Sequence, residues 1–307
     1  MIYHVFANRS NIGDWLSAKG IQKLLKPYTV KECLCDTPFL SQTIDSLLKA
    51  TGKDLIIIGG GGLLMDYFLP FWKSFLPIAD KVSFCIWGIG YCDLKYERSH
   101  PPLKLVEEII NKSKLSIVRD EITRNYLKDC RLPEPVACPS LNVIDKQDKL
   151  ECNGLLHVDN YTTVGAKSYE IMCEIGQAFA EKNGFEYYST NNRIKNDDEH
   201  ELENVLKKYT YSEYILSSAL HGCIIGVAME KKVLAVSGDR KIDSFMESVG
   251  LRDWVLDSKD VGHIAEKLNA LGKQEDVTLF VERHRQKNKD VAQQIIHMIR
   301  DNRVDIS

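Results

Sequence analysis

The chain has 307 residues, of which 44% are hydrophobic and 27% charged, and its formal net charge is -3. This composition is typical of a globular protein long enough for two domains, and the slightly acidic balance gives no reason to expect a nucleic-acid partner. No stretch approaches the roughly 20 apolar residues of a membrane span, and the first residues lack the basic and apolar segments of a secretory signal. We therefore expect a cytoplasmic protein with at most peripheral membrane contact.

The sequence contains nine cysteines, an odd number, and none of them forms a C-x-x-C pair. Cys33 and Cys35 are separated by one residue, which is too close to begin a zinc site without a second pair. This usage is typical of reduced cytosolic thiols that mostly fill the core. We expect free thiols and no metal site.

The first half alternates short apolar strands with helical segments. Strands are predicted at residues 2–7, 28–34, 55–58, 82–87 and 115–118, and helices at residues 15–25, 41–50, 101–111 and 121–128. The run 55–58 is apolar at every position, as is typical of a parallel strand that is covered on both faces. The alternation indicates crossover connections within a parallel sheet.

Four glycines, Gly59 to Gly62, follow directly on the strand 55–58. Because they have no side chains, they let a substrate meet the backbone at the carboxyl end of the strand. The run is neither G-x-G-x-x-G nor a Walker sequence with its lysine, so both nucleotide fingerprints are excluded. The alternative is a tight turn of purely structural importance, although such a turn needs only one or two glycines.

Polar residues follow two other strands of this half. Asn11, Gly13 and Asp14 lie between the first strand and the first helix, where Asp14 could be a helix cap and nothing more. Arg119 lies at the end of strand 115–118, and the carboxyl ends of strands form the edge at which open α/β sheets bind ligands. The alternative for Arg119 is a local ion pair with Asp120.

The second half repeats the alternation. Residues 145–153 are charged and aperiodic, so we place the linker there and divide the chain into domains 1–148 and 149–307. Strands are predicted at residues 154–158, 185–189, 214–216 and 233–236, and helices at residues 168–183, 242–249 and 277–300, with one more helix ending at residue 209. The polar loop 191–201 is expected to be a solvated surface. The fold class is therefore α/β, with two doubly wound, Rossmann-like domains facing each other across a cleft.

The stretch Tyr214 to Gly226 is the most informative in the chain. Ser218 is predicted to cap a helix, which places His221 at the third helical position. There the imidazole lies beside unpaired backbone N–H groups and the positive end of the helix dipole. Such an end binds anions, and a histidine beside a bound anion can supply or accept a proton. The alternative is a core helix with an incidental histidine, although Gly222 and the small serines leave room for a ligand.

Four stretches together resemble the polysaccharide pyruvyl transferase family. They are, in the family's order, Asn11-Ile12-Gly13-Asp14, Gly59-Gly60-Gly61-Gly62, Val118-Arg119-Asp120 with Thr123 following, and Ser217-Ser218-Ala219-Leu220-His221-Gly222 with Lys241 further on. The resemblance implies a glycosyltransferase-B-like fold of two domains. It also implies the transfer of pyruvate from phosphoenolpyruvate to a sugar, which forms a cyclic ketal during cell-surface glycan assembly.

The resemblance also implies roles for these residues. His221 is expected to be the general acid that protonates the methylene carbon of the donor, and Asp14 the base for the attacking hydroxyl. Asn11 and Asp14 are expected at the acceptor. The phosphate and carboxylate of the donor require fixed cations and backbone donors. The candidates for this part of the site are Arg119, Arg240, Lys241, Gly60, Gly61, Gly62, Ser217, Ser218, Leu220 and Gly222.

Phosphoenolpyruvate would be the co-substrate, no further cofactor is expected, and the acceptor would be a saccharide or a lipid-linked saccharide. Many family members carry arginine where this chain has Ala219, and that arginine would be expected to bind the phosphate or carboxylate of the donor. Arg119, Arg240 and Lys241 are the candidates to supply the missing positive charge. Two other classes of function stay open. One is a glycosyltransferase whose nucleotide-sugar donor is held by the His221 helix and a basic residue such as Lys241. The other is a catalytically silent binding protein, for which Ala219 is the best argument.

Overall fold

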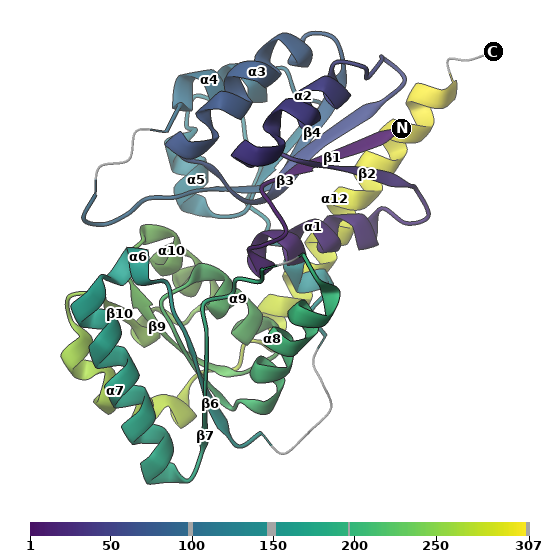
Figure 1. The fold of residues 1–307 in the computed structure, drawn as a ribbon. Helices are drawn as coiled ribbons and strands as arrows, with labels where there is room; N and C mark the ends of the chain where they lie inside the picture. Colours follow the sequence, from purple (N-terminus) through teal and green to yellow (C-terminus); the bar gives the residue numbers. More distant parts are fainter. Residues whose placement is uncertain (98–100, 146–151, 196, 305–307) are drawn as a thin grey trace.

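The computed structural model describes residues 1–97, 101–145, 152–195 and 197–304. It contains two α/β domains, one above the other in Figure 1, and each is built around a five-stranded parallel sheet. Helices alternate with the strands in both domains. The predicted fold class, two doubly wound domains, is therefore confirmed.

The first domain has its core on both faces of its sheet. The strands are β1 (Ile2–Phe6), β2 (Val30–Leu34), β3 (Leu55–Leu64), β4 (Ser83–Tyr91) and β5 (Leu115–Val118). The helices are α1 (Ile12–Leu24), α2 (Leu40–Leu47), α3 (Leu69–Ala79), α4 (Leu103–Ile110) and α5 (Glu121–Tyr126). Along β3, Ile56 and Ile58 pack into one hydrophobic cluster, whereas Leu55 and Ile57 pack into another. This division confirms a strand that is covered on both faces.

The second domain repeats the same plan. Its strands are β6 (Gly154–Val158), β7 (Glu186–Thr190), β8 (Tyr214–Ser217), β9 (Lys232–Ser237) and β10 (Val255–Asp257). Its helices are α6 (Tyr161–Val164), α7 (Ala166–Asn183), α8 (Glu199–Tyr211), α9 (Leu220–Ala228), α10 (Arg240–Val249), α11 (Ile264–Ala270) and α12 (Thr278–Val304). Single 3-10 turns complete the chain at η1 (Thr37–Phe39), η2 (Asp66–Phe68), η3 (Pro139–Asn142), η4 (Arg252–Trp254), η5 (Val261–His263) and η6 (Leu271–Lys273).

The two sheets have the same topology. The strand order is β2-β1-β3-β4-β5 in the first sheet and β10-β9-β8-β6-β7 in the second. Counted from the first strand of each domain, both are the doubly wound order 2-1-3-4-5. In this order the direction of winding switches between the first and third strands, and ligands bind in the crevice at the carboxyl ends of that strand pair. The topology therefore marks two places, the ends of β1 and β3 and the ends of β6 and β8.

The glycine run belongs to a strand and not to the predicted loop. β3 continues through Gly59–Gly62 to Leu64, and its register against β4 shifts between Gly61 and Leu64. Gly60 and Gly61 have φ angles of 83° and 101°, which glycine adopts far more readily than other residues. The sequence prediction was wrong here because a run of glycines usually ends a strand, whereas in this sheet it forms an irregular extension.

Backbone hydrogen bonds connect the two domains at two places. One of them is the loop 191–201, which was predicted to be a solvated surface. Ile12 N donates to Asn192 O at 3.0 Å, and Ile194 N donates to Ser10 O at 2.9 Å. The described part of loop 191–201 is therefore a contact between the domains and not simply a solvated surface. On another side of the contact, Arg240 N donates to Asp93 O at 2.9 Å.

Helix α12 runs from the second domain along the first (Figure 1). Its buried residues Val291, Ala292, Ile295 and Ile299 share a hydrophobic cluster with Trp87 of β4. The predicted domain boundary between residues 148 and 149 falls within 146–151, which lie outside the described residues, so the boundary stays a prediction. What the structure adds is that the last helix of the chain completes the core of the first domain.

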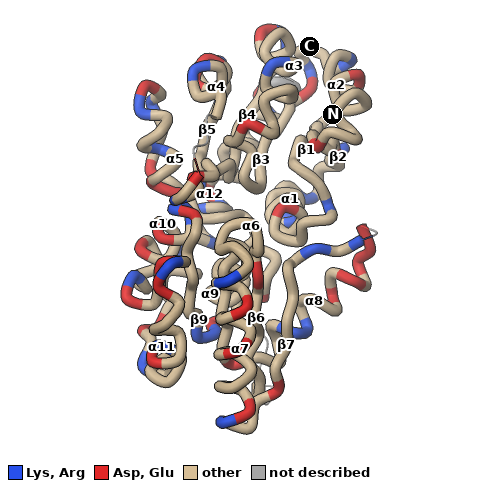
Figure 2. The backbone as a smooth tube through the Cα atoms, turned by 60° about the vertical axis from the view of Figure 1, so that its left-hand side comes forward, with Lys and Arg blue, Asp and Glu red and all other residues tan. Residues whose placement is uncertain are grey.

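Charge is distributed without a dominant sign. Acidic and basic residues are spread over the helices of both domains (Figure 2), in keeping with a net charge of only -3. Within the part of the chain that the structure describes, no helix combines the length and the apolar character that crossing a membrane requires.

One buried hydrogen bond fixes α12 to the first domain. Trp87 Nε1 donates to Asn288 Oδ1 at 3.0 Å, and Asn288 Nδ2 donates to Ala137 O at 3.0 Å. We expect Asn288→Ala to lower the free energy of unfolding by about 1–3 kcal/mol, because the buried Trp87 N–H loses its acceptor. Urea denaturation measures the change. Asn269→Ala is the control, since the exposed Asn269 amide bonds only Ala265 O within its own helix. Equal losses in the two variants would contradict this account.

Candidate functional site

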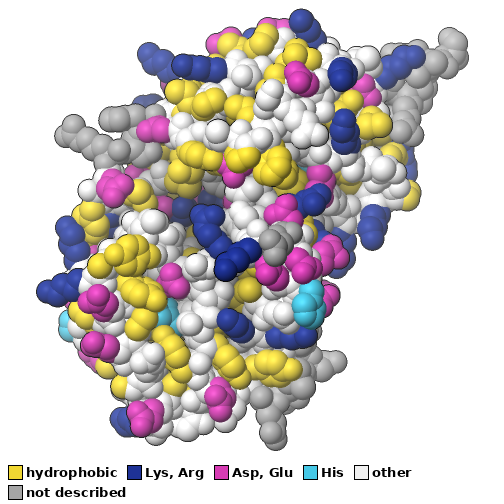
Figure 3. Space-filling view, viewed as in Figure 1, with side chains coloured by type: hydrophobic (Ala, Val, Ile, Leu, Met, Phe, Trp, Pro, Cys, Tyr) yellow, Lys and Arg dark blue, Asp and Glu magenta, His cyan; other side chains and the backbone are white. Residues whose placement is uncertain are grey.

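The candidate site lies where the carboxyl edges of the two sheets meet. The first domain contributes the loop after β1 and the glycine end of β3, and the second contributes the His221 turn, which we define as Ser217–Gly222. Figure 3 shows a hollow between the upper and lower halves of the molecule, with Lys and Arg side chains gathered beside it.

Helix α1 presents Asp14 to the end of β3. Asn11 is the N-cap, and its Oδ1 accepts a hydrogen bond from Gly13 N at 3.0 Å, so Asp14 lies in the first turn and is not the cap. A Cβ atom on Gly61 would lie 2.2 Å from Asp14 Oδ1. Glycine is therefore required at position 61 for the carboxylate to reach the strand.

His221 packs directly on the first domain. A Cβ atom on Gly13 would lie 2.0 Å from the His221 ring, so no larger residue fits there. The N-cap of α9 is Ala219, which makes no side-chain capping bond. The prediction that Ser218 caps this helix was wrong, because its Oγ instead accepts a hydrogen bond from Asn160 N at 2.7 Å. His221 consequently occupies the second helical position and not the third.

The remaining residues of the His221 turn hold its shape. Ser217 Oγ accepts a hydrogen bond from Ala219 N at 3.1 Å and donates one to Ala219 O at 2.9 Å. A Cβ atom on Gly222 would lie 2.1 Å from that hydroxyl, and Leu220 is buried in the core. Contact of Ser217, Leu220 and Gly222 with a donor stays a prediction.

Arg119 is buried at the end of β5 with an unpaired donor atom. Only 6% of its surface is exposed, and its Nε donates to Asp120 Oδ2 at 3.3 Å. Asp120 also caps α5 by accepting a hydrogen bond from Thr123 N at 2.8 Å. The local ion pair that the sequence suggested therefore exists. It leaves Nη1 buried and without a hydrogen-bond partner among the described residues, a costly state that an acceptor from outside would relieve.

Lys241 brings a second cation from the other domain. Its Nζ lies 2.6 Å from Asp239 Oδ2 and 3.3 Å from Cys92 Sγ. Cys92 and Arg119 both adjoin Gly62, since a Cβ atom on that glycine would lie 2.8 Å from Cys92 Sγ and 3.8 Å from Arg119 Nη2. Burial acts to lower the pKa of Lys241, but Cys92 and Asp239 outweigh it and raise the pKa, so the ammonium stays charged.

The positive charges of Arg119 and Lys241 affect the pKa values of both Asp14 and His221. Burial raises the pKa of Asp14 from 3.8 to about 6, although Arg119 and Lys241 stabilise its carboxylate. Burial lowers the pKa of His221 from 6.5 to about 3, and the two positive charges act in the same direction. At neutral pH the ligand-free site therefore holds a neutral imidazole and a carboxylate that is mostly ionised.

Two of the residues that were predicted to bind phosphoenolpyruvate, Arg240 and Gly60, make contacts within the protein. Arg240 Nη1 donates to both carboxylate oxygens of Asp93, at 3.2 and 3.1 Å, which gives it a role in joining the domains. Gly60 lies against α1, where a Cβ atom would come within 2.9 Å of Ser17 Oγ. Their contact with a donor stays a prediction.

Sequence reasoning missed two cysteines and an arginine. Cys138 Sγ lies 3.2 Å from Ser17 Oγ and 3.9 Å from His221 Nε2, and Cys92 touches Lys241 as described. Arg193 pairs with Asn11 in an isolated antiparallel bridge, and its exposed side chain makes no hydrogen bond or ion pair with the described residues. An apolar residue, Ile194, within a charged loop was the one feature of the sequence that could have indicated contact of this segment with the first domain.

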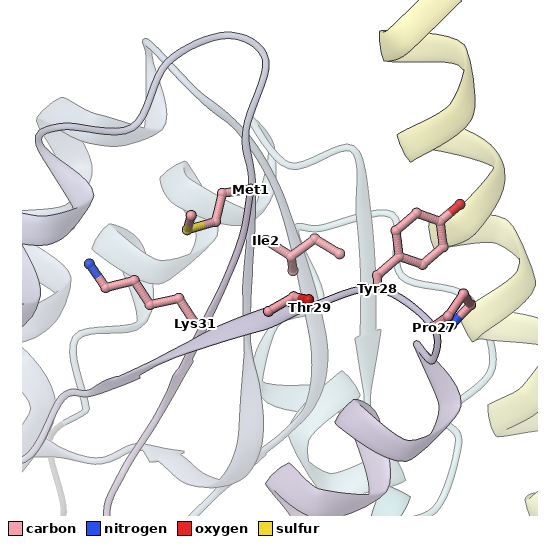
Figure 4. Close-up of a pocket in the computed structure, with 6 residues that line it drawn as sticks. All are labelled: Met1, Ile2, Pro27, Tyr28, Thr29 and Lys31. Carbon is pink, nitrogen blue, oxygen red and sulfur yellow. The ribbon is translucent and has the colours of Figure 1, made fainter.

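A separate pocket opens at the opposite edge of the first sheet. It lies at the amino ends of β1 and β2 and is lined by Met1, Ile2, Pro27, Tyr28, Thr29 and Lys31 (Figure 4). None of these residues belongs to the four motifs, and doubly wound sheets bind their ligands at the carboxyl edge. We therefore place the candidate site at the contact between the domains and not in this pocket.

Solved structures with the same fold extend over nearly the whole chain. The S. aureus MnaA–UDP complex has a TM-score of 0.58 and 13% identity and covers 96% of this chain and 94% of its own. A putative UDP-N-acetylglucosamine 2-epimerase from Listeria monocytogenes has a TM-score of 0.55 and 10% identity, with coverages of 100% and 97%. The Neisseria meningitidis UDP-GlcNAc 2-epimerase bound to UDP-GlcNAc has a TM-score of 0.51 and 13% identity, and the match covers 97% of this chain and 98% of the epimerase. At these identities the likeness shows the fold alone, which is glycosyltransferase-B-like.

The family comparison is more specific than the fold. No curated protein matches the chain. The family described as polysaccharide pyruvyl transferase matches residues 11–240, from the N-cap of α1 to the start of α10. This range covers most of the chain and holds Asp14, the glycine run, Arg119 and the His221 turn. The chain therefore belongs to the polysaccharide pyruvyl transferase family.

Proposed function

We propose that this protein transfers the pyruvyl group of phosphoenolpyruvate to two hydroxyls of one saccharide. The observation that carries the proposal is the buried Arg119, whose Nη1 has no partner among the described residues. A donor with a phosphate and a carboxylate would supply the missing oxygen. Lys241, 15% exposed, stands close enough to act on the same groups as Arg119.

The His221 turn would hold the other end of the donor. The N-cap residue of α9, Ala219, has only a methyl side chain and makes no capping bond, so the first backbone N–H groups of the helix would be available to an anion. In family members with arginine at this position a third cation would stand here. In this chain Arg119 and Lys241 would provide the fixed positive charge.

The reaction would begin at the carbon–carbon double bond of phosphoenolpyruvate. A proton is added to the methylene carbon, which becomes the methyl group of the ketal, and the neighbouring carbon becomes electrophilic. One sugar hydroxyl attacks that carbon and gives its proton to a base. The carbon–oxygen bond to phosphate then breaks, and the second hydroxyl closes the ring. Its proton leaves with the phosphate.

His221 would be the acid that protonates the methylene carbon. With a pKa of about 3 its imidazole is neutral at pH 7, so it needs help to hold a proton. The bound donor would supply that help, because its negative charge offsets Arg119 and Lys241 and raises the pKa of His221. The site would thus make its acid only when the donor is present.

Asp14 would be the base for the attacking hydroxyl. Its pKa of about 6 lies near neutral pH, where a carboxylate accepts a proton readily and is still largely ionised. Asn11, at the N-cap of the same helix, would contact the acceptor beside it.

We also propose the setting of the reaction. The donor would be the co-substrate and no other cofactor would take part. The acceptor would be a saccharide or a lipid-linked saccharide, and the protein would act in the cytoplasm with at most peripheral contact to a membrane and no nucleic-acid partner.

A donor-binding experiment tests the proposal against the main alternative, glycosyl transfer from a nucleotide sugar. Phosphoenolpyruvate at a hundred times its dissociation constant should stabilise the protein by about 2.7 kcal/mol, seen as a rise in melting temperature. Arg119→Ala should weaken that binding by about 1.5–3 kcal/mol, because a charge-assisted hydrogen bond is lost. Arg131→Ala, at an exposed position, is the control. A rise with UDP-sugars only would favour glycosyl transfer, and unchanged affinity in Arg119→Ala would remove Arg119 from the site.

His221→Gln tests the acid. Glutamine keeps much of the polarity but cannot deliver a proton, so turnover should fall by about a hundredfold or more, with little change in donor affinity. Phosphate release measures turnover, and His297→Gln is an exposed control. Histidine NMR should also show the pKa of His221 rising from about 3 when phosphoenolpyruvate is added. Normal turnover in a folded His221→Gln variant would mean that the histidine is only part of the scaffold.

Asp14→Asn tests the carboxylate through stability. A carboxyl group whose pKa is raised on folding contributes most below its unfolded pKa, and that contribution is lost as pH rises through about 6. The shift of about two units corresponds to about 3 kcal/mol. Asp14→Asn should therefore be more stable than the parent by about 3 kcal/mol at pH 8 and by about half as much at pH 5, as measured by urea denaturation. Asp45→Asn is the exposed control. A gain that does not vary with pH would refute the raised pKa.

A further inference from the structure

The loop after β6 stands beside the His221 turn, at the switch point of the second sheet. β6 and β8 are neighbours, with Val158 paired with Ser217, so the residues that follow each strand are adjacent. Ser218 N donates to Val158 O at 2.9 Å, and Asn160 N donates to Ser218 Oγ at 2.7 Å. Thr163 Oγ1 also donates to Ser218 O at 3.3 Å. Loop and turn thus form one hydrogen-bonded unit.

Asp159 places a carboxylate in this unit without a side-chain partner. Its backbone N–H donates to Thr190 O at 2.9 Å, which fixes its position at the end of the strand. Its carboxylate interacts with the backbone N–H of Tyr161, and within the described ranges no cation or side-chain donor pairs with it. Partial burial raises the pKa of Asp159. A half-buried carboxylate of this kind retains free acceptor positions.

Tyr161, at the start of α6, exposes an aromatic ring beside that carboxylate. The residue is 53% exposed, and its hydroxyl has no hydrogen-bond partner among the described residues. The ring rests edge-to-face on Tyr169, with centroids 5.7 Å apart, so it is supported from below. The exposed Tyr67 and Tyr96 differ, because the hydroxyl of each is bonded to an aspartate.

Helix α6 lies on the side of the second domain that faces the first (Figure 1). Asp159 and Tyr161 consequently lie at the same edge of the second sheet as His221, which follows the adjacent strand. A half-buried carboxylate next to an exposed ring matches the two surfaces of a sugar, its hydroxyls and its apolar C–H face. A phosphate is excluded as the ligand of this pair, since Asp159 would repel it.

We propose that Asp159 and Tyr161 form a saccharide-binding subsite beside His221. The carboxylate of Asp159 accepts hydrogen bonds from two neighbouring sugar hydroxyls, and the ring of Tyr161 stacks on the C–H face. The inference rests on the proposed function, because it locates the acceptor of that reaction. It places the acceptor mainly on the second domain, opposite Asp14.

Capture of saccharides tests the subsite directly. The fluorescently labelled full chain is applied to an array of immobilised oligosaccharides that includes hexoses, N-acetylhexosamines and uronic acids. We expect the unmodified chain to bind at least one class. Tyr161→Ala and Asp159→Asn should lower the bound signal by about tenfold or more, the size of one lost charge-assisted bond or stacking contact. Tyr161→Phe should retain most of it, because the ring remains.

Matched variants exclude general effects. Tyr211→Ala and Asp253→Asn change the same residue types at exposed positions on α8 and η4, and both should bind saccharides normally. Binding equal to the unmodified chain in Tyr161→Ala, or no capture by the unmodified chain, would overturn the subsite. Loss of UDP binding in Tyr161→Ala would overturn it too, by showing that the ring stacks on a nucleotide base.

The same proteins separate this inference from the proposed function. Each variant is also heated with phosphoenolpyruvate, and Tyr161→Ala and Asp159→Asn should keep the rise in melting temperature. If phosphoenolpyruvate fails to stabilise the unmodified chain while saccharides are captured through Tyr161, the proposed donor is wrong and the subsite stands. If the donor stabilises every variant and saccharide capture does not depend on Tyr161 or Asp159, only the subsite is wrong.

Discussion

The arrangement of the site depends on holding two cations, the buried Arg119 and the largely covered Lys241, where the domains meet. Arg119 and Lys241 come from different domains, and each is held by a carboxylate of its own domain, Asp120 at 3.3 Å and Asp239 at 2.6 Å. Each carboxylate also caps the helix that follows its strand. A buried charge without a partner is strongly destabilising. The pairing lets the cations stay charged while part of the Arg119 guanidinium remains available to a ligand.

Glycines make this density of charge possible. Cβ atoms at Gly13, Gly61 and Gly90 would lie 2.0, 2.2 and 2.1 Å from the side chains of His221, Asp14 and Arg119, respectively. Each charged or titratable group therefore rests against bare backbone. The glycines of the NIGD and GGGG stretches are accordingly explained by the side chains that they face as well as by any ligand that approaches them.

The periodicity of the sequence was sufficient for the fold, since alternating apolar strands and helices leave few topologies. Predictions from local sequence were wrong where a residue bonds a segment that is distant in the chain. Ser218 has the composition of a cap, but its hydroxyl is occupied by Asn160 from another loop. Ile194 turns a charged loop into a domain contact by pairing with Ser10. Tyr161 gave no signal, because its nearness to His221 follows from the order of the strands, which no local window contains.

Helix α12 has a consequence for how the molecule is made. The face of the first sheet that carries Trp87 is covered partly by Ile21 and Leu25, at the end of α1, and partly by four residues of α12: Val291, Ala292, Ile295 and Ile299. During synthesis the first domain leaves the ribosome long before these residues exist, and domains emerging early ordinarily fold as units. Here part of one apolar face stays uncovered until residues 291–299 have been made. The first domain therefore completes its core only after the strands of the second domain have been made.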